Sequence, residues 1–373
     1  RSILVSAVGL LNKPILPDIP GLSDFKGPAF HTARWDSSVD LEGKRVALVG
    51  SGASGIQVGP EIAPKVKHLS IFQRSPQWIY MRANYGRDVP EGVKWALRNV
   101  PLYAKWYRFQ LLWAYSDGLY PALVRDLGWD RTDSISAFND DIRKLWTAYI
   151  EKQLGDRPDL LAKAIPNFPP FGKRPLFDTG WFDMLKRDNV SLTQSGISRI
   201  TADAIETEDG KRHEVDVIVF ATGFHASFML NSLSVAGRGG RTIRDEWGEE
   251  DPKAYLGMTV PGFPNLFILN GPNTAYAHGG SIAFNAECQS GYVLQSITEM
   301  MRRQAATMEV DQAAYEKYNQ ILDKEHENLV WAHHNVRTWY KNKSGRVTAV
   351  TPFKVKDYWE MTSKVTSEDY KFS

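Results

Sequence analysis

The sequence predicts an α/β protein whose centre is a dinucleotide-binding fold. Three observations lead to this class. A strand, a glycine-rich turn, a helix and a second strand follow one another within residues 44–72, which is one βαβ unit. Residues 85–165 then change to helical spacing, rich in Trp, Tyr, Arg and Leu. The α/β pattern returns after Pro166, so the nucleotide fold is interrupted by a helical insertion.

Each expected element follows from its local pattern. Short apolar runs predict strands, apolar residues at helical spacing predict helices, and prolines predict the irregular linker. In chain order the expected elements are a strand at Ile3–Val8, a linker at Asn12–Leu22, a strand at Lys44–Val49, a helix from Ser54 to about Val66, a strand at His68–Phe72, a helix and strand within Gly180–Thr193, a buried strand with a tight turn at His213–Phe224, and helices at about Ser281–Arg303 and Ala313–His334.

Composition excludes several classes of protein. The 373 residues are 43% hydrophobic and 24% charged, as in an ordinary soluble protein, and the formal net charge is +2. This charge predicts no attraction to nucleic acid or to a membrane. A single cysteine, Cys288, excludes an internal disulfide framework and a structural zinc site, and we expect no metal and a cytoplasmic location. The sequence contains no run of about 18 apolar residues, so no membrane-spanning helix is expected.

The first strand raises a question about the N-terminus. Residues 1–8 read RSILVSAV, so a buried-looking strand begins almost at once. A lone strand has no partner for its backbone groups. We therefore expect that an N-terminal piece precedes this chain.

The glycine-rich turn G-S-G-A-S-G is expected to bind a dinucleotide. Gly50 permits the sharp turn after the strand, Gly52 lets backbone N–H groups approach a pyrophosphate, and Gly55 lets the helix pack on the strand. The start of the helix adds a partial positive charge. Ser51, Ala53 and Ser54 complete the cradle.

The end of the next strand predicts the choice of cofactor. An NAD site usually places an acid there, but this strand ends in Phe72-Gln73-Arg74-Ser75. A guanidinium beside a hydroxyl can bind a 2′-phosphate through charge-assisted hydrogen bonds. Arg74 and Ser75 thus predict NADPH, the alternative being that Arg74 is simply a solvated surface residue.

The aromatic stripe at Trp106–Tyr115 in the insertion has two interpretations. Large aromatic side chains at helical spacing are commonest in a packed core, which is the favoured interpretation. The other interpretation is a wall of the substrate cavity or an oligomer face, which leaves a homodimer open.

A further string, F-x-G-x-x-x-H-x-x-x-W-D, stands just ahead of the nucleotide fold, and its fixed residues are Phe25, Gly27, His31, Trp35 and Asp36. With this string the chain resembles flavin-dependent Baeyer–Villiger monooxygenases. By side-chain chemistry, Phe25 and Trp35 suit packing and Gly27 suits a tight turn. The resemblance implies that His31 lies where the flavin and NADP domains meet and couples cofactor binding to domain position.

Two more stretches carry the resemblance. In NFPPFGKRPLFDTGWF, it implies that Arg174 stabilises negative charge beside the flavin and that Lys173 joins Arg74 at the 2′-phosphate. In DVIVFATGF, it implies that the turn Ala221-Thr222-Gly223 lies near a cofactor. Asn273 and His278, in GPNTAYAHGGS, carry little weight as catalytic groups.

The resemblance extends over essentially all 373 residues and is closest to the 4-hydroxyacetophenone monooxygenase branch. It implies a two-dinucleotide-binding-domain flavoprotein that holds FAD and NADP(H). The expected parts are the end of the FAD domain and a linker at 1–37, the NADP-binding domain at 38–84 and 166–224, the helical insertion at 85–165, and the C-terminal part of the FAD and substrate domain at 225–373. The glycine fingerprint for FAD is absent from the sequence.

The implied reaction converts ketones, and specifically aryl ketones, to esters with NADPH and O₂ through a flavin C4a-peroxide. Two alternatives stay open at this point. One is a flavin monooxygenase that oxidises nitrogen or sulfur, which shares the A-T-G turn but not the W-D ending. The other is a truncated NADP-binding module without activity.

Overall fold

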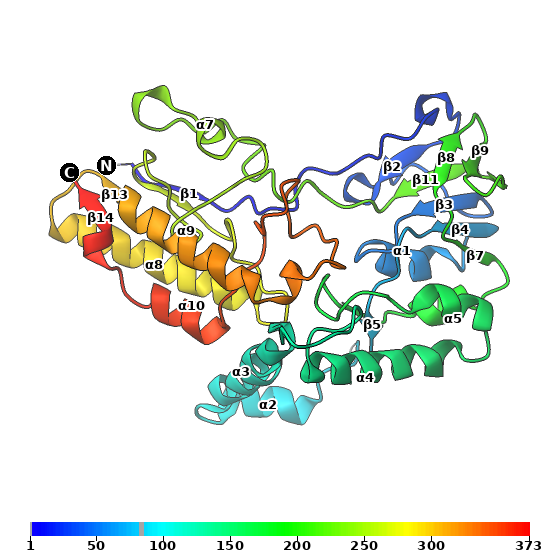
Figure 1. Cartoon of the computed structure of the whole chain (residues 1–373), viewed down its shortest axis with the longest axis horizontal. Coiled ribbons are helices and arrows are strands. Elements are labelled where there is room, and N and C mark those ends of the chain that lie inside the picture. The colour runs from blue at the N-terminus through cyan, green and yellow to red at the C-terminus, as the bar shows by residue number, and fades with distance from the viewer. Residues whose placement is uncertain (1, 82–85) are drawn as a thin grey trace.

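Five parallel strands form the central sheet of one lobe of the molecule, in the order β2-β11-β3-β4-β7 (Figure 1). The computed structural model describes residues 2–81 and 86–373. The expected boundary between residues 84 and 85 therefore lies outside the described residues. The strands of this sheet are β2 (Ala29–His31), β11 (Val217–Phe220), β3 (Arg45–Val49), β4 (His68–Phe72) and β7 (Val190–Thr193).

The predicted strands at the centre of the fold are confirmed. β3 and β4 lie where the apolar runs placed them, and β3 is buried from Val46 onward because both faces of the sheet are covered. The expected strand at 213–224 is instead two strands, β10 (Arg212–Glu214) and β11, in different sheets. The break falls at Asp216, whose carboxylate receives hydrogen bonds from the Arg45 backbone and side chain.

Helices cover this sheet and fix the loops at its edge. α1 is a turn shorter than expected, because Pro64 has no backbone N–H with which to continue the helical hydrogen bonds. The helix and strand predicted within 180–193 are confirmed as α6 and β7. The helices and small strands packed around the sheet are α1 (Gly55–Ile62), α4 (Ala137–Leu154), α5 (Pro158–Ala164), α6 (Trp181–Leu185), β5 (Ile79–Tyr80), β6 (Leu176–Phe177), β8 (Ile197–Ile200) and β9 (Ala204–Thr207).

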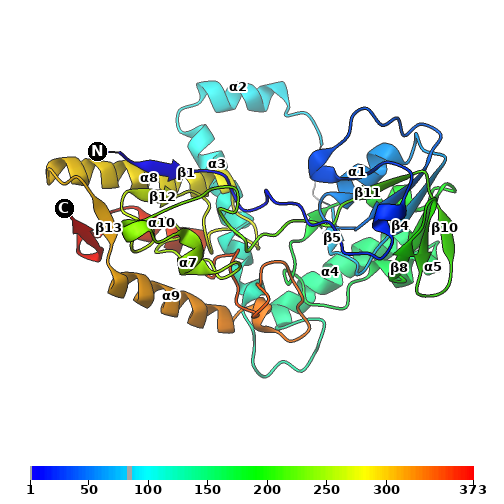
Figure 2. The same ribbon diagram turned by 90° about the horizontal axis from the view of Figure 1, so that it is seen from above.

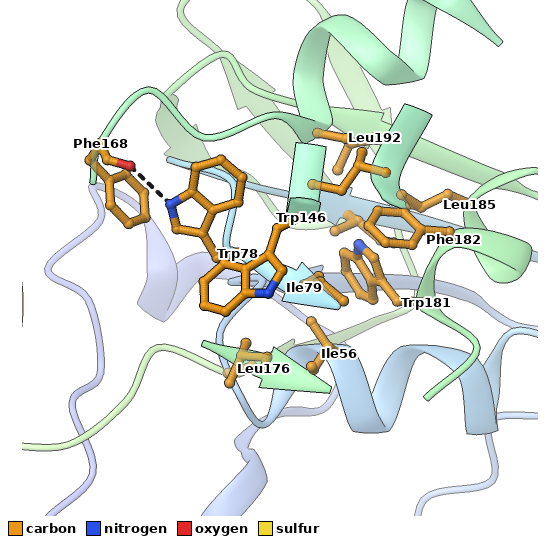
Figure 3. Close-up of a cluster of buried hydrophobic side chains, with 14 of the residues drawn as sticks. Ile56, Trp78, Ile79, Trp146, Phe168, Leu176, Trp181, Phe182, Leu185 and Leu192 are labelled. Carbon is orange, nitrogen blue, oxygen red and sulfur yellow. Dashed lines mark hydrogen bonds between the residues drawn. The ribbon is translucent and has the colours of Figure 1, made fainter. Parts of the chain in front are cut away.

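A cluster of large side chains between the sheet and α4 forms the core of this lobe (Figure 3). Trp78 lies at its centre and is 1% exposed. Its indole N–H donates to the Phe168 carbonyl at 2.9 Å, and its own carbonyl accepts from the Leu176 backbone at 2.8 Å. Trp78 therefore holds both ends of the loop that contains Lys173 and Arg174.

The helical insertion does not bury its aromatic stripe. It begins with α2 (Glu91–Asn99) and α3 (Tyr103–Ala114), followed by the short 3₁₀ helix η3 (Asp117–Leu123). Neither α2 nor α3 has a buried residue, and Trp106 is 56% exposed. The favoured interpretation of the stripe as core packing was therefore wrong. Figure 2 shows α2 standing out from the body of the molecule and α3 leading from it back into the body.

The other lobe is mainly helical, and the helix predicted at 281–303 is confirmed as α8. The helix predicted at 313–334 ends earlier, at Glu327, and a short 3₁₀ helix follows. The elements of this lobe are β1 (Leu4–Ser6) paired in parallel with β12 (Leu266–Ile268), α7 (Ile243–Trp247), α8 (Ile282–Arg302), α9 (Gln312–Glu327), α10 (Val355–Thr362), and β13 (Met308–Val310) paired with β14 (Tyr370–Phe372).

Candidate functional site

The glycines of the G-S-G-A-S-G turn have three different environments. Gly50 has a φ of 108°, and a Cβ there would lie 2.5 Å from the Ala221 carbonyl oxygen. A Cβ on Gly55 would lie 2.2 Å from the Gly50 carbonyl oxygen. At Gly52 a Cβ would meet nothing within 4 Å, so the backbone there faces open space. This is the division of roles that a dinucleotide cradle requires.

Arg74, Ser75 and Lys173 come together beside this cradle. The Lys173 ammonium donates to the Ser75 hydroxyl at 2.8 Å and lies 4.4 Å from the centre of the Phe168 ring. Burial, and then the charge of Arg74, lower the pKa of Lys173 to about 8. In the part of the chain that the structure describes, neither Arg74 nor Lys173 forms an ion pair with a carboxylate. Two neighbouring cations without a counterion favour an anionic ligand.

Arg174, the next residue of the same loop, lines a cavity of about 570 Å³, and Lys173 is not among the residues that line it. The cavity lies between the two lobes, since its walls come from α1, the β5–β6 region, α3 and the loop before α8. Several of the walls are aromatic: Tyr80, Phe171, Phe177 and Tyr276. The loop of residues 168–176 therefore places adjacent basic residues at two different sites.

His278 is a buried polar residue in the wall of this cavity. It is 1% exposed, and its ring lies between the rings of Tyr120 and Tyr276, at 5.7 and 6.0 Å. Within the described residues neither ring nitrogen has a hydrogen-bond partner. Burial lowers the pKa of His278 to about 4, so the ring is neutral near pH 7. From the sequence His278 carried little weight, whereas its place in the cavity wall and its two nitrogens without partners make it a candidate for a role at this site.

Asn273, in the same sequence stretch, is not among the residues that line the cavity. It is 1% exposed, and its side-chain amide donates to the Val347 and Val350 carbonyls at 2.8 and 3.1 Å. Its role here is to connect two loops, which agrees with the small catalytic weight assigned to it from the sequence.

The A-T-G turn closes the sheet against the cradle and holds the linker. Ala221 donates to the Val49 carbonyl, and the Gly223 carbonyl accepts from the Ile15 backbone at 2.9 Å. The Thr222 hydroxyl donates to the Ile15 carbonyl. The structure therefore brings this turn next to Gly50 and fixes residues 14–15 to it, while its nearness to a cofactor stays a prediction.

The F-x-G-x-x-x-H-x-x-x-W-D string forms part of the sheet. Its middle is β2, which pairs in parallel with β11, so His31 lies opposite Phe220. This strand precedes the expected start of the NADP domain at residue 38. His31 is 3% exposed, its Nδ1 accepts from the Ala33 N–H at 3.0 Å, and burial lowers its pKa. The ring packs edge-on against Phe224 at 5.4 Å, directly after the A-T-G turn.

The other residues of the string have structural roles. Phe25 packs against the core beneath the sheet, and Trp35 packs edge-on against Phe30 at 5.1 Å. The Asp36 carboxylate accepts from the Ser38 hydroxyl and N–H, which lowers its pKa. Gly27 is needed because a Cβ would lie 2.2 Å from the Asp216 carbonyl oxygen, rather than for a tight turn with positive φ.

Trp78 is the residue that sequence reasoning missed. Only its place in the stretch after Ser75 offered a signal, and nothing in the sequence shows that it holds a loop some 90 residues away. Among the described residues, no group of three or more His, Cys, Asp or Glu side chains could hold a metal ion. Nor is any described helix both long and apolar enough to cross a membrane.

Comparison with known proteins gives a consistent result. A family model described as flavin-binding monooxygenase-like matches residues 2–98. An uncharacterised monooxygenase, y4iD, of Sinorhizobium fredii is 41% identical over 99% of this chain and 56% of its own length. A Baeyer–Villiger monooxygenase of Streptomyces coelicolor is 33% identical over 99% of this chain and 68% of its own. The chain spans between 56% and 64% of the length of the first three curated relatives.

Solved structures show the same relationship. The crystal structure of OTEMO in complex with FAD and NADP matches the whole chain with a TM-score of 0.82, at 26% identity, and the match covers 75% of that protein. An oxidised steroid monooxygenase bound to NADP matches 99% of the chain with a TM-score of 0.80.

The fold and the cradle define the class as the two-dinucleotide-binding-domain flavoprotein monooxygenases. Within that class, the chain belongs to the Baeyer–Villiger monooxygenase family. The 4-hydroxyacetophenone branch is a finer assignment than these similarities support.

Proposed function

We propose that this chain carries the NADPH site and the reaction cavity of a Baeyer–Villiger monooxygenase that converts aryl ketones to esters. In the overall reaction one oxygen atom of O₂ is inserted beside the ketone carbonyl and the other leaves as water. NADPH and a proton supply the two electrons and the hydrogens, and NADP⁺ is released. The observation that carries the proposal is that one loop supplies Lys173 to the cluster with Arg74 and Ser75, and Arg174 to the cavity.

NADPH fits the site formed by the glycine turn and the cluster of Arg74, Ser75 and Lys173. The turn at Gly50–Gly55 leaves backbone open at Gly52, and Arg74, Ser75 and Lys173 offer two cations and a hydroxyl for a 2′-phosphate. The structurally similar OTEMO forms a complex with NADP and FAD, which supports the same pair of cofactors here.

FAD would face the cavity that Arg174 lines. Arg174 and the loop of residues 276–281 line the cavity, and the turn of residues 6–9 follows β1 on the same lobe. When bound, FAD supplies the hydride acceptance and the oxygen transfer. The chain contributes the environment: Arg174 provides fixed positive charge where negative charge develops on oxygen, and the aromatic walls exclude water.

The substrate class is inferred from the same walls. Tyr80, Phe171, Phe177 and Tyr276 give the cavity flat apolar surfaces on which an aryl ring can stack. Neutral His278 can donate one hydrogen bond to a ketone oxygen. This combination supports an aryl ketone over a small aliphatic one.

Arg174→Ala tests the proposal directly. In the protein supplied with FAD, we expect ester formation from an aryl ketone to fall about a hundredfold or more. NADPH affinity, measured by titration, should stay unchanged because Arg174 is not part of the cluster of Arg74, Ser75 and Lys173. Arg187→Ala removes another exposed arginine, at the end of α6, and serves as the control.

The other outcomes of this assay separate the alternatives. Normal ester formation by Arg174→Ala contradicts the proposed role. Oxidation of amines or sulfides in place of ketones identifies a nitrogen- or sulfur-oxidising monooxygenase. NADPH binding by a protein that shows no flavin absorbance after FAD is added identifies a binding module without activity.

A further inference from the structure

The hairpin formed by α2 and α3 exposes a continuous apolar stripe. Trp106, Phe109 and Trp113 follow one another at spacings of three and four residues, which places them on one face of α3, and Leu102 stands just before the helix. In that order, they are 56%, 51%, 54% and 72% exposed. The rings of Trp106, Phe109 and Trp113 stack along the helix, with centres 5.7 and 6.1 Å apart. Isolated exposed apolar residues need no explanation, but a patch of this kind indicates a binding surface.

The backbone at the elbow of the hairpin supports the same conclusion. Leu102 has a φ of 64°, a backbone conformation that residues other than glycine rarely adopt. It is also the most exposed of these four apolar residues. Trp95, on α2, is 62% exposed as well. Large apolar side chains are therefore exposed at and near the elbow between α2 and α3.

Positive charge surrounds this apolar surface. Residues 91–115 contain four basic side chains and one acidic one, a net charge of +3, although the whole chain carries only +2. Lys94 pairs with Glu91, and Arg108 pairs with Glu287 of α8. Arg98 and Lys105 form no ion pair within the described residues, and both line a hollow of about 400 Å³ at the elbow. They stand on either side of Leu102, where anionic groups can reach them.

The opposite face of α3 belongs to the reaction cavity. Leu111, Leu112 and Tyr115 line it, together with Met81, which is 65% exposed. One helix therefore presents an apolar stripe to the outside and walls the cavity on its other side. A surface on which the stripe rests would lie next to the entrance for an apolar ligand.

We infer that the α2–α3 hairpin docks on the surface of an anionic lipid bilayer. Tryptophan and phenylalanine side chains enter the boundary between headgroups and acyl chains, while flanking lysine and arginine side chains bind anionic headgroups. The charge of the hairpin favours this occupant over a second copy of the chain, because Arg98 and Lys105 of one hairpin would repel those of the other. Docking requires the exposed face alone, and it is independent of the chemistry proposed for the cavity.

Vesicle binding by the whole chain tests the inference. We expect co-sedimentation with vesicles of equal parts phosphatidylcholine and phosphatidylglycerol, weaker binding to phosphatidylcholine alone, and a decrease with added salt. Brominated lipids should quench tryptophan fluorescence in the bound protein.

Three variants identify the surface. Trp106→Ser with Phe109→Ser and Trp113→Ser should weaken binding at least about tenfold. Arg98→Gln with Lys105→Gln should weaken it roughly fivefold for each charge removed. Leu11→Ser with Leu16→Ser removes two exposed apolar side chains of the linker, which runs along the opposite edge in Figure 1, and should leave binding unchanged. All of these positions are exposed, so unchanged circular dichroism is expected.

Two results would overturn the inference. One is vesicle binding that the triple serine variant retains in full. The other is a dimer in solution that the triple variant dissociates, with no binding to anionic vesicles; this result would assign the stripe to a second copy of the chain.

Discussion

Lys173 should make cofactor binding by the cluster of Arg74, Ser75 and Lys173 depend on pH. Its pKa of about 8 in the unliganded protein reflects burial and the neighbouring Arg74. A bound 2′-phosphate favours the charged ammonium, so binding draws a proton to Lys173 when the pH is above this value. The same amine must be protonated for the cluster to hold its full charge.

We therefore expect the preference for NADPH over NADH to decline as the pH rises through about 8. The measurement is the ratio of the two dissociation constants between neutral and alkaline pH. In Lys173→Met the ratio should be small and independent of pH in that range. A ratio that stays constant in the unaltered protein would remove Lys173 from the cofactor site.

His278 allows a separation of stability from binding. Its two ring nitrogens lack partners in the described structure, and a buried polar group without partners destabilises the fold. His278→Phe should therefore leave the melting temperature unchanged or raise it, while the KM for the ketone rises. His278→Asn, which keeps a donor, should recover part of the affinity. A variant that melts earlier and keeps its KM would show a purely structural role.

At the scale of single elements, the glycine turn offers a matched pair of substitutions. Gly50→Ala places a Cβ against the Ala221 carbonyl at a φ of 108°, and should cost at least about 2 kcal/mol of unfolding free energy. Gly52→Ala meets no atom within 4 Å and should keep that stability while weakening NADPH binding. Urea denaturation and NADPH titration of both variants check the pair, and equal stability losses would contradict it.

The loop of residues 168–176 depends on Trp78 for its shape. Trp78→Phe keeps most of the buried volume but leaves the Phe168 carbonyl without its indole donor. We expect a loss of about 1–3 kcal/mol in unfolding free energy. Because both Lys173 and Arg174 lie on this loop, NADPH affinity and ester formation should fall together. Trp181→Phe, in the same core and without a position on the loop, is the control.

Local sequence patterns predicted the elements whose structure is set by residues close to one another in the sequence. The runs at 44–49 and 68–72 are buried strands with a glycine turn between them, and both lie where the sequence placed them. The break between β10 and β11 depends on Asp216 meeting Arg45, a contact between distant segments. Trp78 and the exposure of α3 likewise follow from what lies next to them in space, which spacing along the chain does not contain.

The residues of the candidate site differ in the same way: some could be predicted from the sequence and others could not. Lys173 and Arg174 carry charge in an otherwise apolar stretch, and Arg74 stands where an NAD site usually has an acid, so all three could be found in the sequence. His278 became a candidate only when its burial and its missing partners were known. The direction in which each side chain of the 168–176 loop points is set by the core beneath it.

At the scale of the whole molecule, cofactor binding should stabilise the chain. The proposed NADPH site joins the turn after β3, the end of β4 and the 168–176 loop, so a bound ligand opposes unfolding of the whole sheet. At a concentration a hundredfold above its dissociation constant, NADPH should add about 2.7 kcal/mol. Thermal unfolding followed by fluorescence should show a rise in melting temperature, smaller with NADH. No shift at saturating NADPH would count against the site.

The position of β11 in the sheet has a consequence for synthesis on the ribosome. β11 lies between β2 and β3, and Arg45 must wait for Asp216, 171 residues later, to complete its contacts. At ordinary rates of translation this delay is roughly ten to thirty seconds. Throughout that time the nascent chain presents the unpaired edges of two strands together with the aromatic helices of the insertion. We expect such a chain to be a chaperone client until Phe220 has left the exit tunnel and the middle of the sheet is filled.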